Sequence, residues 1–184
     1  DIITCSKGIS SGYVPLSATL LSEAMYDVIS VPQSEGAMFT HGFTYSGHPI
    51  SYAAGRKNIE IMERDDICGY VRDVGPYLEE QLASLLEHPI VGDVRGSHFM
   101  MCIENVADKE TKALLPAEAA IGNRIAAHCQ SRGVIVRPIA HLNVLSPPLI
   151  LTRQQIDTMV EVLHDSIRAT QDDLIREGIW RSAR

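Results

Sequence analysis

Short apolar runs alternate with long segments of helical period along this 184-residue sequence, and this alternation most constrains the fold. One helical pattern opens at Pro49, a residue that the first helical position tolerates, and continues to about residue 87. Another follows Thr152, which forms a capping box with Gln155. The predicted strands are residues 2–6, residues 14–21, two within residues 90–106, residues 134–139 and residues 143–151. This order predicts an α/β fold with a second, smaller α+β part.

The first long helical pattern contains two interruptions. Gly69 and Gly75–Pro76 fall inside it, so we expect a bend or two helices in series. His88–Pro89 ends the pattern and marks a domain boundary. The sequence therefore predicts one domain over residues 1–88 and a second over residues 89–184.

The remaining helical segments carry clear start and stop signals. They are residues 23–30, ended by Pro32, residues 116–132, stopped by Gly133, and a last helix that begins after Thr152. The last helix has an apolar face at helical spacing, and we expect that face to be buried. It is formed by Ile156, Met159, Val160, Leu163, Ile167 and Leu174.

The composition excludes several classes of protein. The chain is 45% hydrophobic and 21% charged, which is ordinary for a soluble globular protein. Its net charge is −7 and no basic stripe is present, which argues against a nucleic-acid partner. No apolar stretch is long enough to span a membrane, and no signal peptide precedes the first strand. We therefore expect a cytoplasmic protein.

The cysteines and histidines show no metal-binding spacing. The four cysteines are scattered without a C-x-x-C pair, which predicts free thiols in a reducing compartment. His41 and His48 lie seven residues apart, which fits no usual pair of metal ligands. The sequence predicts no metal site.

The chain begins at Asp1 and runs straight into an apolar strand, without an initiator Met or a basic leader. We interpret the 184 residues as part of a longer protein. We also expect part of any active site to lie outside them.

Lys7 follows directly after the apolar run of residues 2–6. The adjacent isoleucines of this run predict a strand buried on both faces. Ligands of α/β sheets bind beyond the carboxyl ends of strands, which is where Lys7 lies. A partly desolvated lysine loses proton affinity, and its neutral amine can form a Schiff base with a carbonyl. Gly8 and Gly12 would allow a ligand to approach the backbone closely. An ordinary surface lysine is the alternative.

Residues 33–48 have neither a helical nor a strand period, and sixteen such residues indicate a functional loop. Thr44, Tyr45 and Ser46 supply hydroxyls just before the helix that opens at Pro49. Hydroxyls beside the backbone N–H groups of a helix start are typical of a phosphate site. A turn-rich loop that only caps the helix is the alternative.

Arg137 ends the apolar run VIVR and precedes a proline. A guanidinium in this place should have a carboxylate or phosphate partner, because its fork matches planar anions. From the residues alone, a bound ligand and a structural Asp or Glu are equally good partners.

Three segments of the sequence together resemble one known family. SKGISSGYVPLSA, HGFTYSGHPISYAAG and RGVIVRPI with VLSPPLILT closely resemble, in this order, the class III aminotransferases. These are pyridoxal-phosphate enzymes of fold type I, and the resemblance is closest to the ω-transaminase branch. It covers essentially the whole chain. It implies that residues 1–88 are the later part of the large cofactor-binding domain and that residues 89–184 are the small C-terminal domain.

The resemblance implies a role for four residues. Lys7 matches the lysine that forms a Schiff base with pyridoxal 5′-phosphate and then shuttles a proton between Cα and C4′. Thr44 matches the threonine that reaches across a homodimer interface to the phosphate of the partner's cofactor, and Phe43 lies against the same site. Arg137 matches the mobile arginine that grips the substrate carboxylate and swings away for amines without one.

The implied function is transfer of an amino group from an amine or ω-amino acid to a keto acid, with pyruvate as the expected acceptor. An aminomutase, racemase or decarboxylase on the same scaffold, or a non-catalytic segment that serves dimerisation, are the alternatives. The family's acidic partner of the pyridine nitrogen, its stacking aromatic and its phosphate loop all precede the lysine strand and are not among these residues. We therefore expect the isolated 184 residues to be inactive. The stretch 139–143 after Arg137 also has fewer glycines than many relatives.

Overall fold

A computed structural model of the chain describes residues 1–31, 35–36 and 39–181. The chain divides into two compact units, Asp1–Asp66 and Ile67–Arg184. This division by contacts falls 22 residues before the predicted domain boundary, because the helix after residue 66 packs with the second unit. The assignment of residues 1–88 and 89–184 to two enzyme domains remains a prediction. Pro32, expected to end the first helix, and part of the predicted functional loop lie outside the described residues.

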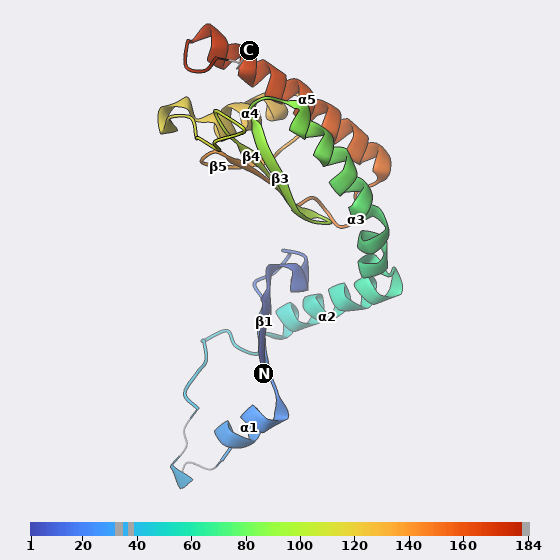
Figure 1. The fold of residues 1–184 in the computed structure, drawn as a ribbon. Coiled ribbons are helices and arrows are strands. Elements are labelled where there is room, and N and C mark those ends of the chain that lie inside the picture. Colours follow the sequence, from blue (N-terminus) through green and yellow to red (C-terminus); the bar gives the residue numbers. More distant parts are fainter. Residues whose placement is uncertain (32–34, 37–38, 182–184) are drawn as a thin grey trace. The chain divides into compact units, whose positions relative to one another are not determined.

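The first unit contains an antiparallel strand pair and a helix packed beside the turn that joins the strands (Figure 1). The pairing aligns Ile2 with Leu21 and Ser6 with Ser17. The elements are β1 (Ile2–Ser6), the 3-10 helix η1 (Lys7–Ser10), β2 (Ser17–Leu21), α1 (Glu23–Ile29) and α2 (Pro49–Arg64). The first predicted strand and the proline start of the long helix are confirmed, and the strand predicted over residues 14–21 is present but begins only at Ser17.

The prediction that the first strand is buried on both faces is wrong for this chain. Ile3 is 66% exposed, and of the five residues of β1 only Cys5 is half-buried. A two-stranded pair has two open faces, and it buries a face only where another layer packs on it. In the described part of this unit, the helical contacts of β1 are with η1, at its carboxyl end.

The long helical pattern forms two helices in series, as one of the two expected arrangements, but the break was placed wrongly. α2 ends at Arg64, Asp66 adopts a left-handed φ of 43°, and α3 (Ile67–Ala83) runs on through Pro76. Gly75 serves packing instead of a break: a Cβ at this position would lie 2.6 Å from the side chain of His98. A tertiary contact therefore accounts for a residue that the pattern presented as a helix breaker.

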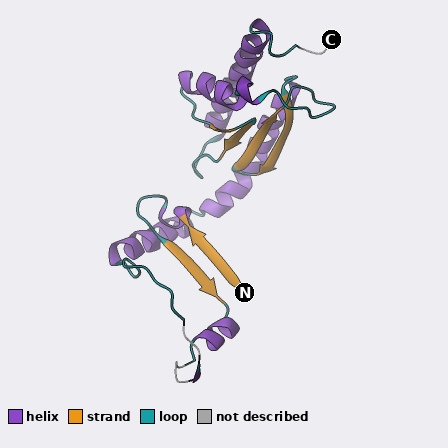
Figure 2. Cartoon of the chain, turned by 90° about the vertical axis from the view of Figure 1, so that its left-hand side faces the viewer, coloured by secondary structure: helices purple, strands orange, loops and turns teal. Residues whose placement is uncertain are grey.

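The second unit combines an antiparallel sheet of four strands with three helices (Figure 2). α3 contacts β3, α4 contacts β5 and β6, and α5 contacts both other helices. The strands, in sheet order, are β3 (Val91–Ser97), β4 (Met100–Asn105), β6 (Leu142–Leu145) and β5 (Arg137–Ile139). The helices after α3 are the 3-10 helices η3 (Ser84–Glu87) and η4 (Ala117–Ala119), then α4 (Ile121–Ser131) and α5 (Arg153–Arg176).

The last helix is confirmed in full. Thr152 and Gln155 form the predicted capping box, with the Thr152 Oγ1 accepting from the Gln155 backbone N–H at 3.3 Å. All six residues of the predicted apolar face of α5 are buried. Leu163 and Ile167 are fully enclosed, and they pack in one core with Leu78 and Leu82 of α3 and Ile103 of β4.

The helix predicted over residues 116–132 begins later than expected. Residues Ala117–Ala119 form a separate 3-10 turn, and α4 starts at Ile121. Ala120 between them has a left-handed φ of 46°, which an α-helix cannot include. The proline signal therefore marked the 3-10 turn and not the α-helix.

The described helices include none that is long and apolar enough to cross a membrane. All four cysteines are free thiols, as predicted. Cys129 is buried in the core, where desolvation raises the pKa of its thiol. It therefore stays protonated and packs as a small apolar side chain.

Candidate active site

Lys7 opens the 3-10 turn that follows β1, and its backbone conformation is unusual. Its φ is 53°, and Ser11 and Gly12 in the same turn also have positive φ values, 51° and 75°. A left-handed φ costs a residue other than glycine about 1 kcal/mol. Such local strain clusters at functional sites, where the surrounding structure maintains it.

The turn is anchored to the unit by side-chain hydrogen bonds that hold its carbonyls. The Asn58 side chain of α2 donates to the Gly8 and Ile9 carbonyls at 3.0 and 3.2 Å. Ser10 is 2% exposed, and its hydroxyl donates to the Val14 carbonyl at 2.7 Å. Neither Asn58 nor Ser10 stands in a motif that predicts these hydrogen bonds, so both residues were missed from the sequence.

The amine of Lys7 is available to a ligand. Lys7 is exposed, and within the described residues no hydrogen bond or ion pair involves its Nζ. A Cβ added at Gly8 or Gly12 would meet nothing within 4 Å, so the turn leaves open space on both sides. The expected partial desolvation of Lys7 is not present in this chain, because β1 and its turn are uncovered. An unpaired amine on a rigid turn with room around it fits a cofactor that is held covalently.

The segment that contains Phe43 and Thr44 is a closed turn. The Phe43 backbone N–H donates to the Ser46 Oγ at 2.8 Å, and the Ser46 N–H donates back to the Phe43 carbonyl at 2.9 Å. Phe43 is 74% exposed and Thr44 is also exposed. His48 caps α2, since its Nδ1 accepts from the Ser51 N–H at 3.3 Å. His48 therefore caps the helix, and the turn before it leaves Phe43 and Thr44 exposed to a ligand or a partner.

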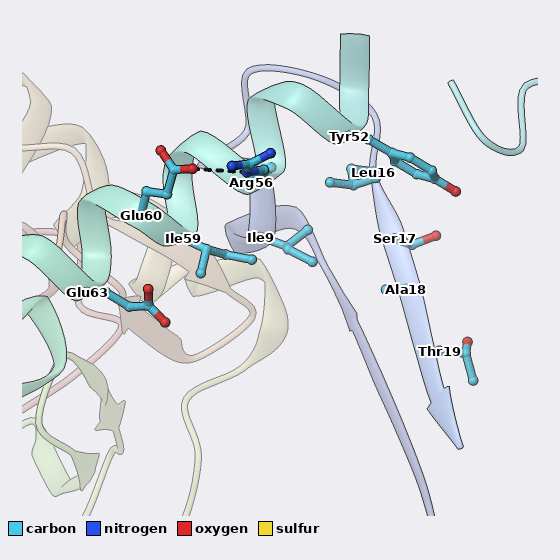
Figure 3. Close-up of a pocket in the computed structure, with 11 residues that line it drawn as sticks. Ile9, Leu16, Ser17, Ala18, Thr19, Tyr52, Arg56, Ile59, Glu60 and Glu63 are labelled. Atoms are coloured by element: carbon cyan, nitrogen blue, oxygen red, sulfur yellow. Dashed lines mark hydrogen bonds and ion pairs between the residues drawn. The ribbon is translucent and has the colours of Figure 1, made fainter. Parts of the chain in front are cut away.

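A groove of about 650 Å³ lies between β2 and α2 in the same unit (Figure 3). Its apolar side chains include Leu16 of the loop before β2 and Ile59 of α2, and the Arg56–Glu60 ion pair lies at its edge. A Cβ on Gly55 would lie 2.3 Å from the Leu16 side chain, so this glycine permits the close approach of α2 and the loop before β2. None of the four predicted site residues lines this groove.

Arg137 begins a strand instead of ending one. Residues 134–136 are not in a strand, and β5 starts at Arg137, which pairs with Val144 of β6. The apolar run before Arg137 is explained by packing, because Val136 is 6% exposed. A buried extended segment has the same apolar pattern as a strand, which is why the sequence suggested a longer one.

The guanidinium of Arg137 is free to bind an anion. Arg137 is exposed, and in the described part of the chain no carboxylate pairs with it. It lines a groove of about 690 Å³ together with apolar side chains such as Leu145 and Met159 and with the polar Gln155. Of the two partners that the sequence left open, this arrangement favours a ligand anion over a structural Asp or Glu.

Two buried asparagines hold the hairpin of β5 and β6, which begins at Arg137, through side-chain hydrogen bonds. Asn105 donates to Asn143 Oδ1 at 2.9 Å and to the His141 carbonyl at 2.7 Å, and Asn143 donates to the Gly122 carbonyl at 2.9 Å. Ala140 in the two-residue turn has a φ of 52°, a conformation that glycine adopts without strain. The hairpin is therefore maintained by this buried network and not by glycine in the turn.

The predicted site residues divide between the two compact units. Lys7, Phe43 and Thr44 belong to the first unit, and Arg137 belongs to the second. Each of the four is exposed and carries its reactive or binding group outward from its own unit.

Comparisons with known proteins agree on one family. The sequence model of the family "Aminotransferase class-III" matches residues 1–167. An uncharacterized aminotransferase, y4uB, of Sinorhizobium fredii (strain NBRC 101917 / NGR234) is 38% identical over 97% of this chain and 39% of its own length. A probable gamma-aminobutyrate transaminase 4 of Oryza sativa subsp. japonica is 35% identical over 94% of this chain and 36% of its own length.

The solved structures agree with the sequence relatives. An amine transaminase from an uncultivated Pseudomonas species, in its PLP-bound form, superposes with a TM-score of 0.88 and 41% identity. The match covers 92% of this chain and 38% of that one. The chain thus spans less than half the length of the relatives that it matches.

Proposed function

Because this chain belongs to the class-III aminotransferase family, we propose that its parent protein is an aminotransferase that depends on pyridoxal 5′-phosphate. It moves an amino group from an amine or ω-amino acid to a keto acid, with pyruvate as the acceptor. The observation that carries this proposal is Lys7, an unpaired amine on a strained, rigid turn in open space. Only about two fifths of the relatives' length is represented here, so the function is that of the full-length protein.

The residues present fit the cofactor. Lys7 would hold it through Nζ, and Thr44, with Phe43 beside it, would meet the phosphate of the cofactor in the partner subunit. The exposed hydroxyl of Thr44 supports this assignment, because a phosphate needs donors that are not already used. When bound, pyridoxal phosphate supplies an electron sink that makes a proton on the substrate's amine-bearing carbon acidic.

Lys7 has a second task in this proposal, as an acid and base. As a neutral amine its Nζ accepts the proton from the substrate Cα, and as an ammonium it donates that proton to C4′ of the cofactor. Both atoms must be reached from one position of the Lys7 backbone. The anchoring of the η1 carbonyls by Asn58 supports this role, because it holds the backbone of the turn in place while the side chain moves.

Arg137 binds the carboxylate of the substrate. Its guanidinium can donate two parallel hydrogen bonds to one carboxylate, and the apolar groove beside it suits the carbon chain. Arg137 is exposed and unpaired among the described residues, so it can leave the site without breaking a structural ion pair. This freedom supports the acceptance of amines that carry no carboxylate.

The Arg137→Gln variant of the full-length protein is expected to lose kcat/KM for pyruvate by about 10- to 100-fold, the loss expected when a charged hydrogen bond is removed. The half-reaction with an amine that carries no carboxylate should change little. Single-turnover kinetics of the two half-reactions measure this difference. Arg168→Gln is the matched control, because Arg168 is a well-exposed arginine of α5. An equal loss in both half-reactions would count against the proposed role.

Product analysis distinguishes the proposed reaction from its alternatives. The full-length protein is incubated with pyridoxal phosphate and an amine donor, with and without pyruvate. A transaminase converts the donor to its carbonyl product and pyruvate to alanine, in equal amounts, and multiple turnover needs the acceptor. A rearranged, racemised or decarboxylated product without pyruvate identifies an aminomutase, racemase or decarboxylase. If the protein turns over no donor with any acceptor, the non-catalytic alternative is the one that remains.

The homodimer is also part of this proposal. Phe43 is 74% exposed and Tyr45 is 80% exposed in the same turn, and large aromatic rings favour burial in an interface. A partner subunit that covers this turn would bring Thr44 to the partner's cofactor. Sedimentation that gives a monomer at working concentration would contradict it.

We also propose a cytoplasmic location for the full-length protein. The support is the four free cysteines, which are typical of a reducing compartment. Cell fractionation that recovers the protein outside the cytoplasm would refute this location.

A further inference from the structure

Three possible metal ligands meet where η3 contacts α5 in the second unit. Glu87 is the last residue of η3, His88 follows it, and His164 lies on α5. The His88 Nε2 lies 2.8 Å from the His164 Nδ1, and the Glu87 Oε1 lies 3.9 and 3.4 Å from these two nitrogens. Neither element carries any of the four residues of the candidate active site.

The hydrogen bonds around His164 decide which of its nitrogens carries the proton. The Ser84 hydroxyl donates to the Gln81 carbonyl at 2.6 Å, so its proton is already used. The same oxygen lies 2.9 Å from the His164 Nε2 and must therefore accept from it. The Nδ1 of a neutral His164 then carries a lone pair, and this lone pair faces His88.

His88 has the corresponding arrangement. Its Nδ1 lies 3.2 Å from the Gln171 Oε1, an acceptor, so this nitrogen carries the proton. The Nε2 of a neutral His88 is then a second lone pair, directed at the first. Two lone pairs at 2.8 Å, with a carboxylate beside them, repel each other unless a cation lies between them. The outer hydrogen bonds of both rings are also the contacts that orient metal-binding histidines in proteins.

The spacing of the three atoms fits a small transition metal. A triangle with sides of 2.8, 3.4 and 3.9 Å has a circumradius of about 2.0 Å, the length of a Zn–N or Zn–O bond, so an ion in the plane of the three atoms can contact all of them. Two imidazoles and one carboxylate are ligands that suit Zn²⁺ better than Ca²⁺ or Mg²⁺, which prefer sites made of oxygen. We propose that Glu87, His88 and His164 bind one divalent zinc ion, with water as the fourth ligand.

The burial of the three side chains agrees with such a site. The His88 side chain is 7% exposed and that of His164 is 20% exposed, while that of Glu87 is 65% exposed. The two imidazoles are held by the core, and the carboxylate lies on the open side, where a metal and its water can enter. Gln171, which orients His88, is itself only 9% exposed.

Metal titration tests the proposal directly. Zn²⁺ is titrated into full-length protein freed of metal, in competition with a chromophoric chelator. We expect one zinc per chain whose affinity falls at least about 100-fold in His164→Gln and at least about 10-fold in Glu87→Gln. Substitution with Co²⁺ should give a visible absorption band that saturates at one cobalt per chain, and His164→Gln should remove it.

The matched control is His128→Gln. His128 also pairs with a carboxylate, that of Asp173 at 2.9 Å, but no third ligand lies beside this pair among the residues that the structure describes. This variant should bind zinc as the unaltered protein does. If His164→Gln does not fold, as judged by circular dichroism, the exposed Glu87→Gln decides the result. The proposal is overturned if the unaltered protein binds no zinc in the micromolar range, which is the result expected if the two rings only share a proton. It is also overturned if Glu87→Gln and a folded His164→Gln keep the full zinc affinity.

Discussion

Replacing Lys7 with alanine is expected to abolish amino transfer by the full-length protein and its covalent attachment to pyridoxal phosphate. Alanine has no amine to hold the cofactor, and it cannot move the proton between the substrate Cα and C4′. Loss of acid–base catalysis alone reduces a rate by about 10²- to 10⁴-fold. The fold should persist, because Lys7 is exposed and its Nζ has no partner within the described residues. Turnover of an amine with pyruvate is the measurement, and circular dichroism monitors the fold.

Borohydride reduction identifies the attachment point independently of activity. Reduction of the full-length protein with its cofactor fixes the cofactor on the amine that holds it, and peptide mapping then locates the label. We expect the label on Lys7 in the unaltered protein and none in Lys7→Ala. Lys57→Ala is the control, since Lys57 is an exposed lysine of α2 that pairs with Glu60. A label on any other lysine would exclude the role assigned to Lys7.

Replacing Leu163 with alanine is expected to cause a large loss of stability in the second unit. Leu163 lies in the middle of α5 and is fully enclosed by the core. Removing a buried leucine side chain costs about 2–5 kcal/mol, since apolar contacts are lost and a cavity remains. The loss should appear as faster exchange of the amide hydrogens of α5 and of the strands that share its core.

Hydrogen exchange followed by mass spectrometry measures this loss peptide by peptide, which separates the second unit from the rest of the protein. Leu149→Ala is the control: Leu149 is 42% exposed, so its replacement should cost less than about 1 kcal/mol. Equal protection of α5 in Leu163→Ala and in the unaltered protein would show that this core does not stabilise the unit.

Features that depend on residues only a few positions apart were predicted correctly. The apolar face of α5 follows from helical spacing, and its start follows from the Thr152–Gln155 capping box, whose contacts span three residues. Pro49 opens α2 because the first position of a helix needs no N–H donor. Strands β3 and β4 were also recognisable, since they form a hairpin with a two-residue turn.

Features that depend on contacts between segments far apart in the chain were predicted wrongly. Gly75 was taken as a helix breaker, but it allows His98 to approach the helix closely. The apolar run before Arg137 was taken as a strand, but Val136 is buried without being in one. The strand before Lys7 was expected to be buried, but burial depends on layers that no local pattern describes. In each case the same residue types suit both the predicted environment and the one observed in the structure.

Candidates for the reactive groups were proposed from the sequence, and their roles remain predictions. Lys7 at the end of a strand, Thr44 before a helix and Arg137 before a proline are arrangements of neighbours in the chain, whereas Phe43 came from the family resemblance. Their chemistry depends on which side chain is present, so the residue order was sufficient to propose it.

The contacts that hold functional groups in place form only in the tertiary structure. Asn58 holds the Lys7 turn from a helix 50 residues away, and His88 meets His164 across 76 residues. Such contacts form only when the folded core places two segments together, and the free energy that places them comes from the burial of many other side chains. A single residue in the sequence therefore carries no signal of its distant partner, whereas a cap, a turn or a periodic face carries its cause within a few positions.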